Sequence, residues 1–345
     1  MSKMKNIAGI LLSSGLLLGS VTSAVADPNK PYPKPVRTYE DLDREDGLKD
    51  PAAIGFGKMA VDVGGKDWPT TVSFRCNATG GHIVSGLTAP KATKVFDNLY
   101  YIGAADVASW AVVTSEGIIL IDALTTQQEA QTYIVDGMRS VGLDPGKVKY
   151  IIVSHEHGDH YGGAPLIQSL SGAHVFMSEI AWQALEHMNE RSPLARSPRP
   201  KRDLVLEDGG HVTLGDTTVT TIATPGHTPG TFSFIIPVKD HGQMHQAAYW
   251  GGNGLPLKIE GQKVFLQSLG KFSQATMLAK VDVEISPHGD TDDTVQRLNE
   301  IGRSKTNPFL VGREKYERYE AVFDFCTRAR MATTLAAGGT AASGE

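Results

Sequence analysis

Apolar residues along this chain recur in two patterns, one typical of β-strands and the other of helices. Short apolar runs bounded by turn-forming residues predict strands. The clearest is Tyr150–Val153, an unbroken apolar run that indicates a strand buried on both faces. The predicted strands span residues 95–102, 110–114, 118–122, 148–153, 173–177, 212–214, 217–223, 231–236, 246–250 and 283–286.

Apolar residues at helical spacing predict helices between these strands. Thr125 is the expected N-cap of a helix over residues 125–141, and Gly142 is its expected end. The other predicted helices span residues 164–170, 179–187, 264–278, 291–303 and 313–330. Strands in both halves of the chain, with helices outside them, predict one layered α/β unit over residues 94–331.

The two ends of the chain lack these patterns. Residues 27–93 contain several prolines, two glycine pairs and the charged run Glu40–Asp50, and their strand-like segment is Thr70–Phe74. We therefore expect an irregular N-terminal extension that packs on the main domain, because it has too few apolar residues for a core of its own. Residues 332–345 are mostly Ala, Gly, Thr and Ser, and we expect a disordered tail there.

The first residues have the pattern of an export signal. Two lysines precede the apolar stretch Ile7–Val21, and Ala24-Val25-Ala26 fits the small-x-small cleavage pattern. We expect residues 1–26 to be a signal peptide that is cut before Asp27, which would place the mature chain in the periplasm or outside the cell. The alternative is an uncleaved anchor, but the apolar core is short and contains glycine, so no stable membrane association is expected.

Composition and charge narrow the class of partner. The 345 residues are 41% hydrophobic and 21% charged, as in ordinary soluble globular proteins, and the formal net charge is −5. An acidic chain has no overall field that attracts nucleic acid, so a nucleic-acid partner is not expected and a small-molecule substrate is.

The chain has two cysteines, Cys76 and Cys326. In an oxidising compartment they could form one disulfide between the early mature chain and the C-terminal helix, or both could be buried free thiols. Neither has the paired spacing of zinc-binding cysteines.

Ionisable residues gather in the segment Ser154–His160, directly after the buried strand. In an extended turn, His155 and His157 can point to the same side and share one metal ion. Asp159 and His160 then offer an oxygen and a nitrogen to a second ion, and zinc accepts both donor types. A single histidine is usually structural, but three histidines and an aspartate this close together favour a metal site.

Two histidines elsewhere complete the predicted ligand set. His227 lies in the rigid loop Thr224–Gly230 at the end of a strand, and we expect it to be the third ligand of the first zinc ion. His288 follows the apolar strand at 283–286, and we assign it to the second zinc ion. The six predicted ligands are thus His155, His157 and His227 for one ion, and Asp159, His160 and His288 for the other.

Taken together, these motifs resemble those of the metallo-β-lactamase superfamily. They are His-x-His-x-Asp-His at 155–160, Thr-Pro-Gly-His-Thr-Pro-Gly at 224–230, Pro-His at 287–288 and Leu-Ile-Asp at 120–122. The likeness runs from about Pro90 to Arg330, and the six ligand types match the third subclass (B3) of metallo-β-lactamases. The resemblance implies an αββα sandwich with two zinc ions per chain at one edge of the sheets.

Three residues near the ligands are further candidates. Asp122 could cap the next helix, whereas the resemblance implies that it orients the histidine motif from behind the ligands. Most superfamily hydrolases carry a metal-bridging Asp after the late strand, and the lactamases have Cys or Ser there; this chain has Asn253. We expect Asn253 to donate its amide N–H to the substrate or to a developing anion, and the alternative is a left-handed turn residue. Tyr161, next to the last clustered ligand, is expected to wall the substrate site.

The resemblance also implies a hydrolytic mechanism. Two zinc ions would lower the pKa of a shared water, so that a zinc-bound hydroxide opens an amide or ester bond while Asp159 accepts or relays a proton. We expect an exported zinc hydrolase that acts on β-lactams. A lactone, ester or phosphotriester hydrolase is an alternative, favoured by Asn253 and the N-terminal extension. A non-catalytic zinc-binding surface protein is the alternative of another class, and the complete ligand set disfavours it.

Overall fold

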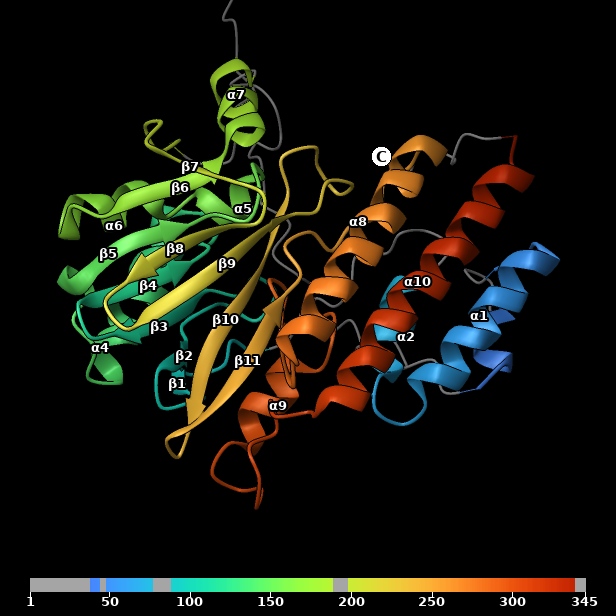
Figure 1. The fold of residues 1–345 in the computed structure, drawn as a ribbon, viewed down its shortest axis with the longest axis horizontal. Helices are drawn as coiled ribbons and strands as arrows, with labels where there is room; N and C mark the ends of the chain where they lie inside the picture. The colour runs from blue at the N-terminus through green and yellow to red at the C-terminus, as the bar shows by residue number, and fades with distance from the viewer. Residues whose placement is uncertain (1–37, 44–47, 77–87, 189–197, 339–345) are drawn as a thin grey trace, which may run out of the picture.

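Two β-sheets lie face to face in this protein, with helices outside them (Figure 1). The computed structural model describes residues 38–43, 48–76, 88–188 and 198–338. The arrangement is the expected αββα sandwich. The predicted signal peptide at 1–26 lies outside the described residues. None of the described helices combines the length and the apolar character that crossing a membrane requires.

The first sheet has seven strands, which lie side by side in chain order. Strands β1 to β4 pair antiparallel, and β4 to β7 pair parallel. The strands are β1 (Thr93–Lys94), β2 (Leu99–Tyr101), β3 (Trp110–Thr114), β4 (Gly117–Ile121), β5 (Val148–Ile152), β6 (His174–Ser178) and β7 (Leu204–Leu206).

The second sheet has five strands in the order β12-β11-β10-β9-β8. Its pairs are antiparallel except for β11 with β12, which run parallel. The strands are β8 (Gly210–Leu214), β9 (Thr217–Ala223), β10 (Phe232–Asp240), β11 (Gln243–Tyr249) and β12 (Val283–Ile285).

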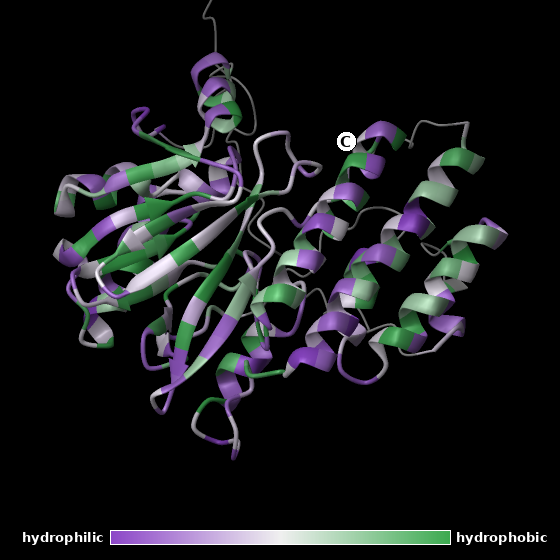
Figure 2. Cartoon of the chain, in the orientation of Figure 1, coloured by the Kyte–Doolittle hydropathy of each residue, from purple (hydrophilic) through white to green (hydrophobic). Residues whose placement is uncertain are grey.

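Helices cover the outer faces of both sheets (Figure 1). The longer ones alternate hydrophobic and hydrophilic segments along their length, as helices with one buried face do (Figure 2). The α-helices are α1 (Pro51–Gly64), α2 (Pro69–Arg75), α3 (Gln127–Glu129), α4 (Asp136–Ser140), α5 (Gly158–Tyr161), α6 (Ala164–Ser171), α7 (Glu179–His187), α8 (Ile259–Ala279), α9 (Thr294–Glu300) and α10 (Arg313–Ala336). Three other short helical segments are η1 (Glu40–Asp43), η2 (Ala130–Val135) and η3 (Pro145–Lys147).

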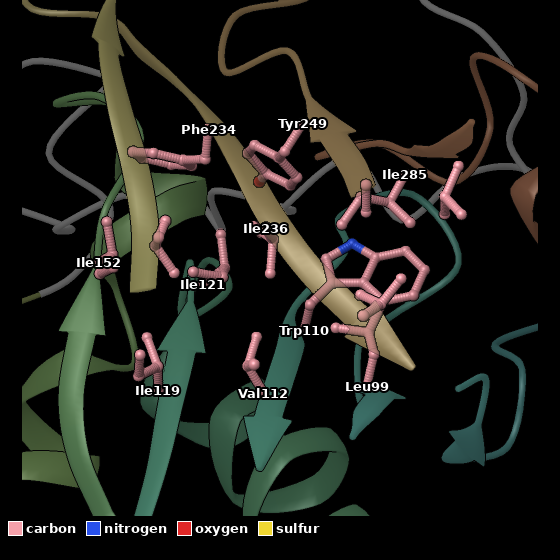
Figure 3. Close-up of a cluster of buried hydrophobic side chains, with 14 of the residues drawn as sticks. Leu99, Trp110, Val112, Ile119, Ile121, Ile152, Phe234, Ile236, Tyr249 and Ile285 are labelled. Atoms are coloured by element: carbon pink, nitrogen blue, oxygen red, sulfur yellow. The ribbon is translucent and has the colours of Figure 1, made fainter. Parts of the chain in front are cut away.

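The core between the sheets holds the strands in register. Strand residues from both sheets point into it, among them Val112 and Ile121 from the first sheet and Phe234 and Tyr249 from the second (Figure 3). Trp110 fills one end of this layer, where its indole N–H donates to Ser286 O at 3.0 Å. This packing fixes the ends of β4, β5, β9 and β12, and the candidate site lies on the segments that follow them.

The N-terminal extension is helical over residues 51–75, which corrects the expectation of an irregular segment. The Asp50 side chain accepts from Ala52 N and Ala53 N, and Pro51 occupies the first turn, so α1 has a capped start. Thr70–Phe74, expected as a strand, lies within α2, because Pro69 begins a helix there.

The C-terminal helix is also longer than expected. Helix α10 ends at Ala336, so residues 332–336 are helical rather than part of a tail. Ala and Leu are strong helix formers. Thr334 is buried and accepts from Gln262 Nε2 of α8 at 3.2 Å, which ties this last turn to the neighbouring helix.

Candidate metal centre

The six predicted ligands lie on the segments that follow three strands, and two of them, Asp159 and His160, lie in the short helix α5. His155, His157, Asp159 and His160 follow β5, His227 follows β9, and His288 follows β12. The structure brings them together in two groups of three, and within each group the ligand atoms lie within 4.8 Å of one another. These are the same two groups that the spacing predicted.

The first group consists of His155, His157 and His227. His227 Nε2 lies 3.1 Å from His155 Nε2 and 3.0 Å from His157 Nδ1, and the latter two nitrogens are 3.2 Å apart. Nitrogens bound to one tetrahedral zinc ion at about 2.0–2.1 Å would be about 3.3 Å from each other. The three nitrogens therefore have the spacing that one zinc ion requires.

The second group consists of Asp159, His160 and His288. Asp159 Oδ2 lies 3.3 Å from His160 Nε2 and 3.8 Å from His288 Nε2. His160 Nε2 is completely buried and forms no hydrogen bond among the described residues, so its contact with Asp159 Oδ2 is electrostatic. A buried nitrogen that lacks a hydrogen bond is costly, and a cation bound between it and the carboxylate would satisfy both groups.

In His155, His160, His227 and His288, the nitrogen that faces away from the group has a fixed partner. His227 Nδ1 donates to Gly254 O at 2.8 Å, and His288 Nδ1 donates to Asp106 O at 3.1 Å. His155 Nδ1 lies 3.0 Å from Ser154 Oγ. Hydrogen bonds of this kind hold the ring orientation and leave Nε2 as the acceptor that a metal ion needs.

Asp122 fixes the fourth of these rings. It is buried, and its Oδ2 lies 2.6 Å from His160 Nδ1 and also accepts from Ser154 Oγ and Tyr249 Oη. Capping of the next helix is excluded as its role, because the side chain of Thr126 caps α3. The contact with His160 agrees with the position behind the ligands that the family resemblance implied.

The electrostatics of the two groups differ. Burial and neighbouring histidines lower the pKa of His155 well below its ordinary value and lower the pKa of His227 to about 3, so both rings are neutral and can accept a cation. Burial also acts against a charge on His160, but the carboxylates of Asp159 and Asp122 raise the pKa of His160 to about 10. A metal ion at the second group must therefore displace a proton.

Two glycines let the chain pass close to His227. A Cβ atom at Gly252 would lie 2.5 Å from His227 Cβ, and one at Gly254 would lie 2.9 Å from the His227 ring. Any side chain at these positions would push the ring away from the group. The glycines of the 251–254 loop are therefore required for packing.

Asn253, in the same loop, does not have the expected free amide. Its side chain is buried, its Oδ1 accepts from Arg75 Nη2 at 2.7 Å, and its Nδ2 donates to Thr291 Oγ1 at 3.0 Å. These partners contradict the predicted catalytic and substrate-binding role of Asn253. The spacing along the chain could not reveal that Arg75, from the N-terminal extension, reaches this loop.

Tyr161 does not line an open site either. Its side chain is completely buried and packs in the core between the first sheet and its outer helices. The predicted contact of Tyr161 with a substrate is therefore wrong in this structure. Successive side chains of a helix point about 100° apart. In α5 the side chain that follows His160 therefore points toward the core.

Sequence reasoning missed Glu156 as a support for the site. Its Oε2 accepts from Thr228 Oγ1 at 2.9 Å, which joins the 154–160 segment to the loop that carries His227. The Thr228 hydroxyl also forms a hydrogen bond with the Thr231 hydroxyl, and the two oxygens are 2.9 Å apart. The alternation of Glu156 with His155 and His157 in the turn was the available signal, because it places the carboxylate away from the metal groups.

Comparison with protein families agrees with this geometry. The family model of the metallo-beta-lactamase superfamily matches residues 102–241, which include strands β3 to β10 and the first metal group. The chain carries a metallo-β-lactamase domain.

Solved structures extend the likeness beyond this segment. BJP-1, a subclass B3 metallo-beta-lactamase of Bradyrhizobium japonicum, is 28% identical to this chain, with a TM-score of 0.63 over 72% of this chain and 97% of BJP-1. MEM-A1, a subclass B3 enzyme from a soil metagenome library, is 26% identical, with a TM-score of 0.60 over 73% of this chain and 97% of its own.

Curated relatives match the metallo-β-lactamase domain over shorter stretches. A hydroxyacylglutathione hydrolase of Pseudomonas entomophila is 31% identical over 137 residues, which is 39% of this chain and 41% of the relative. The N-acyl homoserine lactonase AttM of Agrobacterium fabrum is 32% identical over 108 residues, which is 30% of this chain and 41% of the relative. The chain thus matches about two fifths of the length of these relatives.

Proposed function

We propose that this protein is a zinc-dependent hydrolase that holds two zinc ions, one in each group of ligands. The observation that carries the proposal is the pair of converging donor sets. The first has three nitrogens 3.0–3.2 Å apart, and in the second Asp159 Oδ2 lies 3.3 Å from His160 Nε2 and 3.8 Å from His288 Nε2. When bound, zinc lowers the pKa of a coordinated water and polarises a carbonyl group.

The protein's own residues would orient this chemistry. Asp159 holds its carboxylate between His160 and His288, and burial would raise its pKa, but the positive charge of His160 keeps that pKa well below its ordinary value. Asp159 is therefore ionised at neutral pH and can accept a proton from the reacting water. Asp122, Gly254 and Asp106 hold the ligand rings still while the reaction proceeds.

β-Lactams are the substrate class that we propose. The solved structures reported above are subclass B3 metallo-β-lactamases. In addition, the segment Tyr249–Gly254 contains no aspartate, as expected for lactamases and not for most other hydrolases of the superfamily. We further propose export to the periplasm, based on the signal-like residues 1–26.

Hydrolysis of a lactone or another ester is the second candidate. It is favoured by the curated relatives, which include a lactonase and a hydroxyacylglutathione hydrolase. A panel of a cephalosporin, a carbapenem, an acyl homoserine lactone and a nitrophenyl ester separates the two. The β-lactam proposal requires the highest kcat/KM on the cephalosporin or the carbapenem, and a preference for the lactone contradicts it.

Metal analysis tests the proposed stoichiometry. We expect about two zinc ions per chain in the purified protein. We expect about one in a His288→Ala variant, because the second group then keeps only two ligands. A single zinc ion in the parent, unchanged in both His288→Ala and His160→Ala, would refute the second site.

A further inference from the structure

Arg75, the last residue of α2, reaches from the N-terminal extension into the loop beside the metal centre. Its side chain is 3% exposed, and its guanidinium lies 3.5 Å from the centroid of the Phe323 ring of α10. Nη2 donates to Asn253 Oδ1 at 2.7 Å, and Nη1 donates to Asn253 O. One guanidinium thus holds both the side chain and the backbone of Asn253.

Asn253 connects this contact to the first metal group. The next residue, Gly254, accepts the hydrogen bond from His227 Nδ1 at 2.8 Å. A shift of the peptide at Asn253 would therefore move the carbonyl that orients the His227 ring. The close approach of Gly254 to that ring leaves little room for adjustment.

Asn253 also connects Arg75 to the second metal group. Its Nδ2 donates to Thr291 Oγ1 at 3.0 Å, and Thr291 Oγ1 donates to His288 O at 2.9 Å. The loop that carries His288 is therefore held by the same asparagine. Both ligand-bearing loops are joined to Arg75 through one residue.

The extension holds Arg75 in place. The neighbouring Cys76 forms a disulfide with Cys326 of α10, and Thr70 of α2 donates to Asp293 Oδ1 at 2.5 Å. Burial lowers the pKa of Arg75 to about 10, so the guanidinium keeps its charge at neutral pH, and the nearby carboxylates of Asp292 and Glu284 favour that charge.

We propose that Arg75 is a positioning residue for both metal groups, so that the N-terminal extension is part of the metal centre and not only a cover for the helices. This inference rests on the proposed metal binding. Its physical basis is that hydrogen bonds to a metal ligand's supporting groups set ligand orientation, and losing such a support typically lowers metal affinity by about 10–100-fold.

The test compares Arg75→Met with Arg318→Met. Arg318 of α10 pairs with Asp67, so it also joins the extension to α10, but its partner lies outside the metal loops. Zinc affinity is measured by competition with a chelator, and the visible spectrum is recorded with cobalt(II) in place of zinc. We expect Arg75→Met to lose about 10-fold or more in affinity and to change the cobalt spectrum. Arg318→Met is expected to stay within about twofold of the parent.

Three outcomes would overturn the inference. One is parental zinc affinity in folded Arg75→Met, and another is an equal loss in Arg318→Met, which would assign the effect to general loosening. If Arg75→Met does not fold, Arg75→Lys is measured instead, because an ammonium group cannot reproduce the forked pair of bonds to Asn253. Parental zinc affinity in Arg75→Lys is the third outcome that would overturn the inference. A parent that binds no zinc would instead refute the proposed function on which the inference rests.

Discussion

Two acidic side chains of the 154–160 segment lie in opposite environments. Asp159 Oδ2 faces His160 and His288, whereas Glu156 points to Thr228 on a neighbouring loop. Burial raises the pKa of Glu156, and its exposed fraction is 6%. One carboxylate is therefore placed for chemistry and the other for holding two loops together.

The first prediction follows from this difference. We expect Asp159→Asn to lower kcat/KM by about 100-fold or more, because the variant loses both an anionic ligand and a proton acceptor. Glu156→Gln should lower it less than about 10-fold, because an amide oxygen can still accept from Thr228 Oγ1. Both variants are assayed on the best substrate of the panel, and circular dichroism checks their folding. Comparable losses would mean that Glu156 also faces the reaction.

At the scale of single residues, the sequence was sufficient to predict the ligands but not the residues that hold them in place. His155, His157, Asp159 and His160 are close in the chain, so spacing alone placed them in two sets. Asn253 was expected to contact a substrate, because the sequence does not reveal the side chains that its amide bonds to in the folded protein. Arg75 lies 178 residues away from Asn253 in the chain, and hydrogen bonds over such a separation leave no local pattern.

At the scale of elements, strands that carry the site were predictable and the helices of the extension were not. β5 is an apolar run in a parallel part of the sheet, which gives a strong signal. Strand β7, Leu204–Leu206, was missed because charged residues flank it on both sides and two of its three residues are exposed. The buried residues of helix α1 are two alanines and two glycines, Ala53, Gly57, Ala60 and Gly64. Residues this small did not indicate an apolar face that packs on another helix.

The disulfide joins Cys76, the residue after α2, to Cys326 of α10, and it settles the alternative that the sequence left open. Its two cysteines are 250 residues apart, so the bond constrains a very long loop in the unfolded chain. We expect Cys76→Ser combined with Cys326→Ser to lower the free energy of unfolding by about 3–5 kcal/mol in urea titrations.

A reductant provides the matched control for this prediction. Dithiothreitol should shift the urea midpoint of the parent toward that of the double variant, because it opens the same bond. The double variant itself should not respond to the reductant. A parent whose midpoint is insensitive to complete reduction, confirmed by thiol titration, would show that the bond adds little to stability.

At the scale of the whole molecule, three long helices lie beside the second sheet, with α10 between α8 and α1 (Figure 1). The sandwich itself could be predicted, because the motifs of its loops are specific to one fold. The packing of α1 against α10 could not be predicted, because it depends on shape complementarity between segments far apart in the chain. Glu320 of α10 lies buried in this layer and accepts from Thr276 Oγ1 of α8 at 2.8 Å.

Glu320 should make the stability of the whole molecule depend on pH. Burial raises its pKa in the folded protein from the ordinary 4.5 to about 7. Between these values the unfolded chain has lost the proton that the folded protein retains, so unfolding releases a proton and stability falls as the pH rises. The stabilising contribution is complete below about pH 4.5 and is lost as the pH passes 7, a change on the order of 3 kcal/mol.

Glu320→Gln removes this dependence, because glutamine stays neutral and can still accept from Thr276. We expect the variant to exceed the parent in free energy of unfolding by about 3 kcal/mol at pH 8, and by less than about 1 kcal/mol at pH 5. Glu317→Gln is the control, since Glu317 lies on the same helix with a side chain 56% exposed and should show no such gain. The difference between variant and parent is measured by urea titration at both pH values, so the titration of the histidines cancels. A gain of equal size at pH 5 and pH 8 would show that the benefit comes from packing and not from the buried charge.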